Sequence, residues 1–244
     1  MKTTKLLILF SVFLVNITSL AQTKRLDIKH LTGNFYVYIT YNDYKGTLYP
    51  ANSMYVVTKD GVVMIDTPWD ENQMLPLLDS IEKRHNKKVV MSISTHFHAD
   101  RTAGLNILRA KGIKTYSSVH TYELCKKFKE QEAEYHFTKD TTFQVGEYNF
   151  KTYYPGEGHA PDNIMVCFEK DKVLYGGCFI KSTEATDVGN LSDANPIAWE
   201  KSLARSIRKY PTPKYVIPGH LSWGSNKTMQ YTLELVKKYN RTKK

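Results

Sequence analysis

VVMSISTHFHAD, residues 89–100, joins an apolar run to two histidines and an aspartate. The run Val89–Thr95 predicts a buried strand, and the composition of Ala103–Lys111 predicts a short helix. Histidines one residue apart cannot share the face of a helix, where neighbours are three or four residues apart. We therefore expect His96 and His98 on the loop between the two elements, where open α/β sheets place their ligands.

Three further predicted strand ends carry metal-binding residue types. The strand 148–154 leads into a Gly/Pro-rich turn with His159, the strand 173–177 leads to Cys178, and the strand 214–219 leads to His220. A single His-x-His-x-Asp segment could be an ordinary solvated loop. Four strand ends that each carry a ligand indicate a metal site.

The donor types indicate which metal. Zinc accepts imidazole, thiolate and carboxylate together, and a catalytic zinc keeps one position open for water. Six ligands shared by two ions, three to each, predict a hydrolytic dinuclear zinc site better than a closed structural one. The candidate ligands are His96, His98, Asp100, His159, Cys178 and His220.

These motifs resemble the metallo-β-lactamase superfamily, and in detail the first subclass of the class B β-lactamases. Much of the superfamily has His-x-His-x-Asp-His and a bridging aspartate on a later strand end. Here Arg101 replaces the last histidine and Cys178 occupies the bridging position. This combination is similar to the β-lactamases and unlike glyoxalase II or the nucleases of the superfamily.

The resemblance implies two zinc ions per chain and assigns their ligands. The first zinc takes His96, His98 and His159, and the second takes Asp100, Cys178 and His220. It also implies that Lys181 receives the substrate carboxylate and that Asn190 lies near the lactam carbonyl. Asp100 and Asn190 are then the catalytic candidates.

The implied activity is zinc-dependent hydrolysis of the β-lactam amide of penicillins, cephalosporins and carbapenems, which gives antibiotic resistance. Zinc makes hydroxide available at neutral pH without a serine nucleophile, and no Ser-x-x-Lys or Gly-x-Ser-x-Gly element stands in a fitting context. Two alternatives stay open: another zinc hydrolase of the superfamily, acting on a lactone or thioester, or a secreted zinc-binding protein without turnover. A bridging aspartate would favour the other zinc hydrolase. Closed coordination shells around the zinc ions would favour the zinc-binding protein without turnover.

Further residues are expected around this site. Asp66, at the end of a predicted strand, is expected to orient a zinc ligand rather than to bind zinc. Three tyrosines of the segment 41–49 are either hairpin decoration or, by the family pattern, part of a mobile flap over the site; they are Tyr41, Tyr44 and Tyr49.

The N-terminus has the features of a targeting segment. Lys2 and Lys5 precede the apolar run 6–15, and small residues end the segment 1–21. This pattern predicts a cleaved signal peptide and a mature start at Gln22, hence a periplasmic protein. A membrane anchor is disfavoured because the run is shorter than the roughly 20 residues that span a bilayer.

Composition limits the partners. The formal charge of +10 falls to about +8 without the leader, and the excess is scattered along predicted helices. No basic stripe interleaved with aromatics is present, so nucleic-acid binding is not expected. We expect a small-molecule β-lactam partner, a monomer, and no stable membrane association.

The cysteine count is odd, which is unusual for an exported protein with a disulfide set. Cys125 and Cys167 are expected to be buried without a metal role. A disulfide between them stays open as an alternative.

About 220 residues without a linker predict one domain, residues 22–244. Strands followed by helices, twice over, predict an α/β fold of two sheets back to back with helices outside; the resemblance implies the same four-layer αββα sandwich. Expected early strands are Asp27–His30, Phe35–Tyr41, Met54–Thr58 and Val62–Asp66. Expected helices are Glu71–His85, Ala103–Lys111, His120–Gln131, Ala198–Tyr210 and Asn226–Tyr239. One stripe at helical spacing is expected to be core packing only: Trp199, Leu203, Ile207 and Tyr210.

Overall fold

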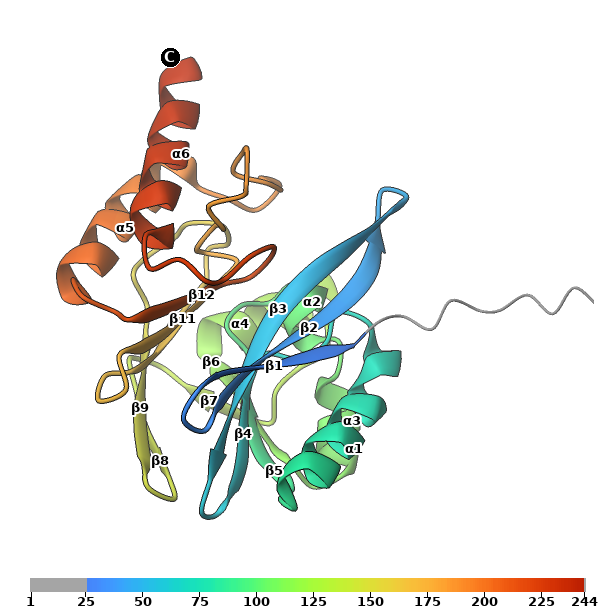
Figure 1. Cartoon of the computed structure of the whole chain (residues 1–244). Coiled ribbons are helices and arrows are strands. Elements are labelled where there is room, and N and C mark those ends of the chain that lie inside the picture. Colours follow the sequence, from blue (N-terminus) through green and yellow to red (C-terminus); the bar gives the residue numbers. More distant parts are fainter. Residues whose placement is uncertain (1–25, 244) are drawn as a thin grey trace, which may run out of the picture.

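The computed structural model describes residues 26–243, which form two β-sheets flanked by helices (Figure 1). The larger sheet contains, in spatial order, β1 (Asp27–Thr32), β2 (Phe35–Tyr44), β3 (Thr47–Thr58), β4 (Gly61–Ile65), β5 (Val89–Ile93), β6 (Lys114–Ser118) and β7 (Tyr135–Phe137). The smaller sheet contains β12 (Tyr215–Pro218), β11 (Val173–Gly177), β10 (Met165–Phe168), β9 (Tyr148–Tyr153) and β8 (Thr142–Val145). The predicted leader, residues 1–21, lies outside the described residues.

The helices lie on the outer sides of the two sheets (Figure 1). They are η1 (Glu71–Gln73), α1 (Met74–His85), α2 (Ala99–Thr102), α3 (Leu105–Ala110), α4 (Val119–Phe128), α5 (Pro196–Lys209) and α6 (Thr228–Thr242). Among the described residues, none of the helices is long and apolar enough to cross a bilayer.

Three apolar clusters hold the layers together. The inner faces of the two sheets meet in one cluster, which includes Val37, Ile65 and Ile93 from the larger sheet and Val166 and Ile217 from the smaller. A second cluster joins the smaller sheet to α5 and α6, and a third joins the larger sheet to α1 and α3. The four-layer αββα sandwich predicted from the sequence is therefore confirmed.

Parallel strand pairs bring the ligand turns to one edge of the sandwich. β4 and β5 are parallel, as are β11 and β12. The carboxyl ends of parallel strands share one edge of a sheet. The two edges lie side by side, because the amide of Asn52 on β3 donates to the carbonyl of Gly219, just after β12, at 2.8 Å.

Two predicted boundaries differ from the structure for local reasons. The helix predicted at Ala103–Lys111 is α3, and a further short helix that was not predicted, α2, precedes it directly after His98. Gly104 separates them where a β-carbon would lie 2.7 Å from the Met74 sulfur. The helix predicted at Glu71–His85 begins with the 3₁₀ turn η1, for which Asp70 accepts a hydrogen bond from the Asn72 amide.

The early hairpin is longer than predicted. β2 and β3 pair without a break from Phe35 with Val56 to Tyr44 with Thr47. Lys45 and Gly46 connect them with φ of 54° and 78°, as in the two-residue turn whose twist suits paired strands. The hairpin tip therefore extends beyond the sheet (Figure 1).

Candidate metal centre

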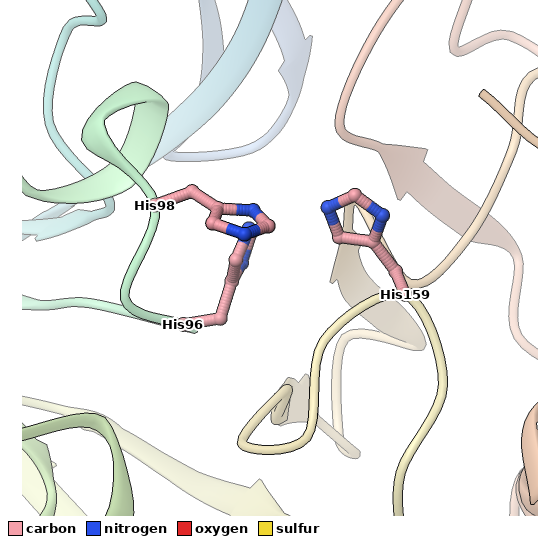
Figure 2. Close-up of side chains that lie close together, drawn as sticks. All are labelled: His96, His98 and His159. Atoms are coloured by element: carbon pink, nitrogen blue, oxygen red, sulfur yellow. The ribbon is translucent and has the colours of Figure 1, made fainter. Parts of the chain in front are cut away.

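Three imidazoles from both halves of the sandwich form the first group, defined as His96, His98 and His159. The first two follow β5, and His159 lies in the turn between β9 and β10. Figure 2 shows the rings turned toward one another, with centroid separations of 4.8, 5.1 and 5.1 Å. One nitrogen of each ring lies within 4.8 Å of the others.

Hydrogen bonds indicate which nitrogen of two rings is free. His98 Nε2 lies 3.1 Å from a carboxylate oxygen of Asp193, which can only accept, so Nδ1 keeps its lone pair. Thr95 Oγ1 donates to Asp66 and can therefore only accept from His96 Nδ1, at a longer 3.4 Å. His96 Nε2 is then the free lone pair, and it is buried without a hydrogen-bond partner in the described part of the chain.

A second group, defined as Asp100, Cys178 and His220, follows β5, β11 and β12. A carboxylate oxygen of Asp100, the Cys178 sulfur and His220 Nε2 are each 3.2 Å from the other two. His220 Nδ1 donates to the Pro50 carbonyl at 2.7 Å, so its Nε2 faces the group with a lone pair. The groups adjoin, because His96 Nε2 is 3.9 Å from Asp100.

Glycine permits the close approach of two ligand strands. A β-carbon at Gly219 would lie 2.6 Å from the backbone nitrogen of Cys178 and 2.7 Å from its sulfur. Any larger residue would therefore displace Cys178 or the neighbouring His220.

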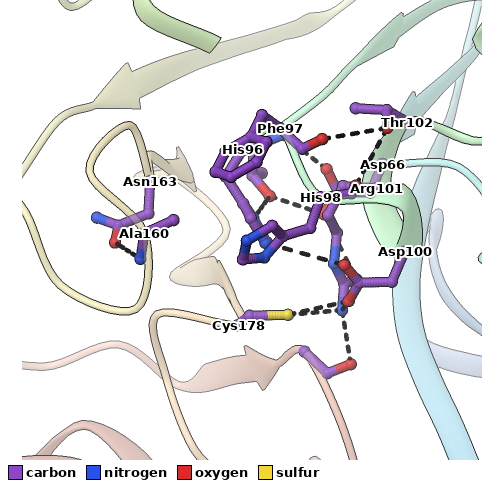
Figure 3. A network of polar contacts seen from close by, with 12 residues as sticks. Asp66, His96, Phe97, His98, Asp100, Arg101, Thr102, Ala160, Asn163 and Cys178 are labelled. Atoms are coloured by element: carbon purple, nitrogen blue, oxygen red, sulfur yellow. Dashed lines mark hydrogen bonds and ion pairs between the residues drawn. The ribbon is translucent and has the colours of Figure 1, made fainter. Parts of the chain in front are cut away.

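The Arg101 side chain, for which the sequence predicted no role, is fully buried behind the second group. Its guanidinium donates to the Cys178 sulfur at 2.9 Å and pairs with Asp100 at 2.8 Å, as Figure 3 shows. It also donates to Tyr175, Asn52 and Gly219. It therefore joins both sheets and compensates the acidic ligands.

Asp66 acts on the ligands indirectly. It accepts from the backbone N–H and hydroxyl of Thr95 at 2.7 and 2.9 Å and from the Tyr175 hydroxyl at 2.7 Å. Arg101 lies 3.5 Å away. Burial raises the pKa of Asp66 to about 6, against the effect of Arg101 and these hydrogen bonds. It contacts no ligand histidine directly but fixes Thr95, the residue before His96.

Burial sets the protonation of the ligands. It lowers the pKa of His96 and His159 well below the usual range of histidine, so both are neutral. Burial also opposes the charge on Asp100, but Arg101 and His220 hold the pKa of that carboxyl well below its ordinary value. Burial raises the pKa of the Cys178 thiol despite Arg101, so a thiolate here needs a further cation in addition to Arg101.

These donor sets fit a metal. His96 Nε2 and His159 Nδ1 are buried without a hydrogen-bond partner among the described residues, which is costly in a protein interior. The first set offers imidazole nitrogens, and the second offers nitrogen, oxygen and sulfur. Both are ligand sets that zinc accepts.

Lys181 and Asn190 occupy different surroundings. Lys181 is partly buried near the second group, and burial lowers the pKa of its ammonium. Asn190 is exposed, and its side-chain oxygen accepts from the Ser192 amide at 3.1 Å. Its loop instead brings Asp193, which the sequence did not single out, to His98.

Aromatic rings from the hairpin border the second group. Tyr49 lies 5.4 Å from the His220 ring, and Tyr44 packs against Tyr49 and Trp69 at 6.1 Å each. Trp69, which the sequence did not single out, is 6.0 Å from His220. The hydroxyl of Tyr41 instead bonds to Asp27, away from the ligands.

Two expectations from the sequence have definite outcomes. Cys125 and Cys167 are buried and free, so no disulfide joins them. The stripe of α5 packs in the core as expected, but core packing is not its whole role. Trp199 also lies 6.0 Å from the His159 ring and 5.3 Å from the Lys181 ammonium.

A family model described as "Metallo-beta-lactamase superfamily" matches residues 46–220, the span that contains all six candidate ligands. This chain belongs to the metallo-β-lactamase superfamily. It is 43% identical to "Metallo-beta-lactamase type 2" of Elizabethkingia meningoseptica, over 91% of this chain and 90% of that protein. It is 40% identical to "Metallo-beta-lactamase IND-1" of Chryseobacterium indologenes, over 85% and 87%.

Solved metallo-β-lactamases have the same fold. The crystal structure of metallo-β-lactamase IND-7 superposes with a TM-score of 0.84 at 40% identity, covering 88% of this chain and all (100%) of that one. The enzyme from Pontibacter korlensis gives 0.85 at 31% identity, covering 87% and 99%. The resemblance to the first subclass of class B enzymes, stated from the sequence, is confirmed by these relatives.

Proposed function

We propose that this protein uses two zinc ions to hydrolyse the amide bond of penicillins, cephalosporins and carbapenems. The observation that carries the proposal is the convergence of two complete three-ligand groups at one edge of the sandwich, with atoms of one group 3.9 Å from the other. When bound, zinc supplies a nucleophile from water at neutral pH and compensates developing negative charge.

The chain's own residues would bind and orient the substrate. Lys181, at the end of the Cys178 segment, would pair with the carboxylate that these drugs carry. The Asn190 amide would donate to the lactam carbonyl. Tyr49 and Trp69, beside His220, would cover the apolar edge of the substrate and exclude water.

Cys178 occupies the position where a bridging aspartate would favour a lactone or thioester hydrolase. The cysteine therefore supports the β-lactamase proposal over that alternative. A neutral-pH thiolate at Cys178 needs a cation, since burial raises the pKa of the thiol. Arg101 and one metal ion would together supply that charge. Three ligands leave each ion short of four, which suits turnover better than storage.

The experiment is hydrolysis of a chromogenic cephalosporin and a carbapenem by purified protein, before and after zinc removal by a chelator. We expect turnover of both, loss of turnover without zinc, and recovery on adding zinc back. Turnover that persists after complete zinc removal would contradict the proposal.

We also propose export to the periplasm as a monomer. The support is the leader pattern of residues 1–21. Cell fractionation and N-terminal sequencing of the mature protein should find it in the periplasm with Gln22 first. Light scattering should give the mass of one chain.

A further inference from the structure

The Trp199 indole is fixed between two parts of the site. It is fully buried on α5, and its Nε1–H donates to the Phe179 carbonyl at 3.0 Å. Phe179 directly follows Cys178 and packs against the indole at 6.3 Å with an interplanar angle of 28°. The indole is therefore anchored to the segment that carries Cys178.

Two candidate functional side chains lie beside this ring. The Lys181 ammonium lies 5.3 Å from the ring centroid, within the range of a cation–π interaction. The His159 ring lies 6.0 Å away at 57°. One residue thus touches both the first metal group and the candidate carboxylate anchor.

An aromatic ring suits a lysine that must bind an anion. Lysine has a flexible four-carbon stem, so an unsupported ammonium samples many positions. A carboxylate partner would fix the ammonium but would also neutralise it and compete with the substrate. The ring attracts the cation through its quadrupole and leaves the N–H donors free for a substrate carboxylate.

We propose that Trp199 is a positioning residue that holds the Lys181 ammonium ready for the substrate carboxylate. This inference deepens the proposed function and, where it concerns the substrate, rests on it. It differs from a core role because it predicts a selective effect on carboxylate-bearing substrates.

Ser202 provides a matched control on the same helix. Its hydroxyl donates to the Glu157 carbonyl at 2.8 Å and so holds the turn that carries His159. No described contact joins Ser202 to Lys181. A Ser202→Ala variant should therefore loosen the same turn without affecting the lysine.

The first experiment compares KM for a carboxylate-bearing cephalosporin with KM for its methyl ester. Trp199→Leu should raise KM for the acid about three- to thirtyfold. This is the range expected for loss of a cation–π contact that is partly or fully shielded from water. KM for the ester and kcat should change much less. Trp199→Phe keeps an aromatic face, so it should retain more of the preference for the acid over the ester than Trp199→Leu does. Lys181→Ala removes the ammonium itself and should show the largest loss of that preference.

Two outcomes of that comparison would overturn the inference. One is an equal rise of KM for acid and ester in Trp199→Leu. The other is a Ser202→Ala variant that loses the preference for the acid to the same degree. Circular dichroism identifies variants that fold, and Trp199→Phe carries the test if Trp199→Leu does not.

A second experiment does not depend on turnover. Acylation of lysines by an amine-reactive ester, read by peptide mass spectrometry, reports how firmly each ammonium is held. Lys181 should react severalfold faster in Trp199→Leu than in the parent protein, while the exposed Lys201 reacts equally in both. Unchanged Lys181 reactivity would overturn the inference. A parent protein that turns over no β-lactam, with faster Lys181 reaction in the variant, would instead overturn the proposed function alone.

Discussion

The two metal groups lie side by side but are stabilised by opposite means. The first consists of three imidazoles, of which His96 and His159 are neutral and each keep a buried nitrogen without a partner among the described residues. The second contains acidic ligands that Arg101 already holds at 2.8 and 2.9 Å. Arg101 thus holds the second group together, whereas the first is held by packing and keeps nitrogens free for an ion.

Two buried carboxylates near the groups, Asp66 and Asp162, differ in how well the protein satisfies their oxygens with hydrogen bonds. Asp66, beside Arg101, accepts hydrogen bonds from Thr95 and Tyr175. Asp162 lies in the turn after His159, and neither of its oxygens has a well-formed hydrogen bond in the described part of the chain. Thr121 and the Phe97 amide lie close enough to oppose the rise in the pKa of Asp162, but burial outweighs them. This contrast predicts different responses to substitution.

The largest expected effect is on Arg101. Arg101→Ala removes the buried positive charge that Asp66, Asp100 and Cys178 surround, and so leaves the negative charge of the two carboxylates without that partner. Breaking a buried ion pair by removing one partner costs about 3–5 kcal/mol. Urea unfolding of the zinc-free protein should show a loss of that size.

His98→Ala is the control from the first group. Its loss should cost less than about 1.5 kcal/mol, since it removes one hydrogen bond from a side chain that is 19% exposed. Equal destabilisation by the two variants would mean that the groups do not differ in how they are held.

The next largest effect concerns metal content. Cys178→Ser removes the thiolate of the second group and leaves all three imidazoles of the first. Loss of a residue that only hydrogen-bonds to a metal ligand lowers metal affinity about ten- to hundredfold. Cys178 is itself a candidate ligand, so zinc affinity at the second site should fall by more than that. Metal analysis should then find about one zinc per chain. Loss of both ions from a folded variant would disprove the division of ligands.

The sequence singled out the candidate ligands that the structure brings together, but not the residues that hold them in place. Each ligand follows an apolar strand, so His96, Cys178 and His220 could be recognised locally. Arg101 was visible only as a replaced histidine, because its partners Asn52 and Gly219 lie 49 and 118 positions away. Only the pairing of both sheets places such residues around one guanidinium.

The fold shows the same limit. Local patterns located most strands and helices, but the number of layers came from order along the chain and from the family resemblance. The spacing of the α5 stripe correctly predicted its buried face. It could not show that Trp199 also meets His159 and Lys181, since those contacts depend on turns from other segments.

A smaller effect is expected at Asp162, whose pKa burial raises to about 7. A raised pKa means that the folded state takes up a proton first, so stability is greatest at low pH and declines as pH rises from about 4 to 7. Asp162→Asn removes this penalty. The zinc-free variant should be about 1–3 kcal/mol more stable than the parent at pH 8, with a gain that shrinks toward pH 4.

Unfolding curves at several pH values decide this prediction. Asp79→Asn, on the exposed side of α1, should change stability by no more than about 0.5 kcal/mol at each pH. A destabilised Asp162→Asn at pH 8 would show that the carboxylate is satisfied after all, and the contrast with Asp66 would fail.

The smallest expected effect is at Asp193, the carboxylate that meets the first group. It holds His98 Nε2 at 3.1 Å and so keeps Nδ1 available for a metal. Asp193→Ala should lower zinc affinity at the first site by about tenfold, the low end for loss of an outer partner of a ligand histidine. Zinc-free stability should hardly change, because the contact lies at a partly exposed edge. Competition with a chromogenic chelator measures the affinity, and Ser192→Ala, which removes a hydroxyl that donates to Asp193 at 2.7 Å, should have a weaker effect. An Asp193→Ala variant with parental affinity would mean that packing alone orients His98, and the first group would then have no polar support at that ligand.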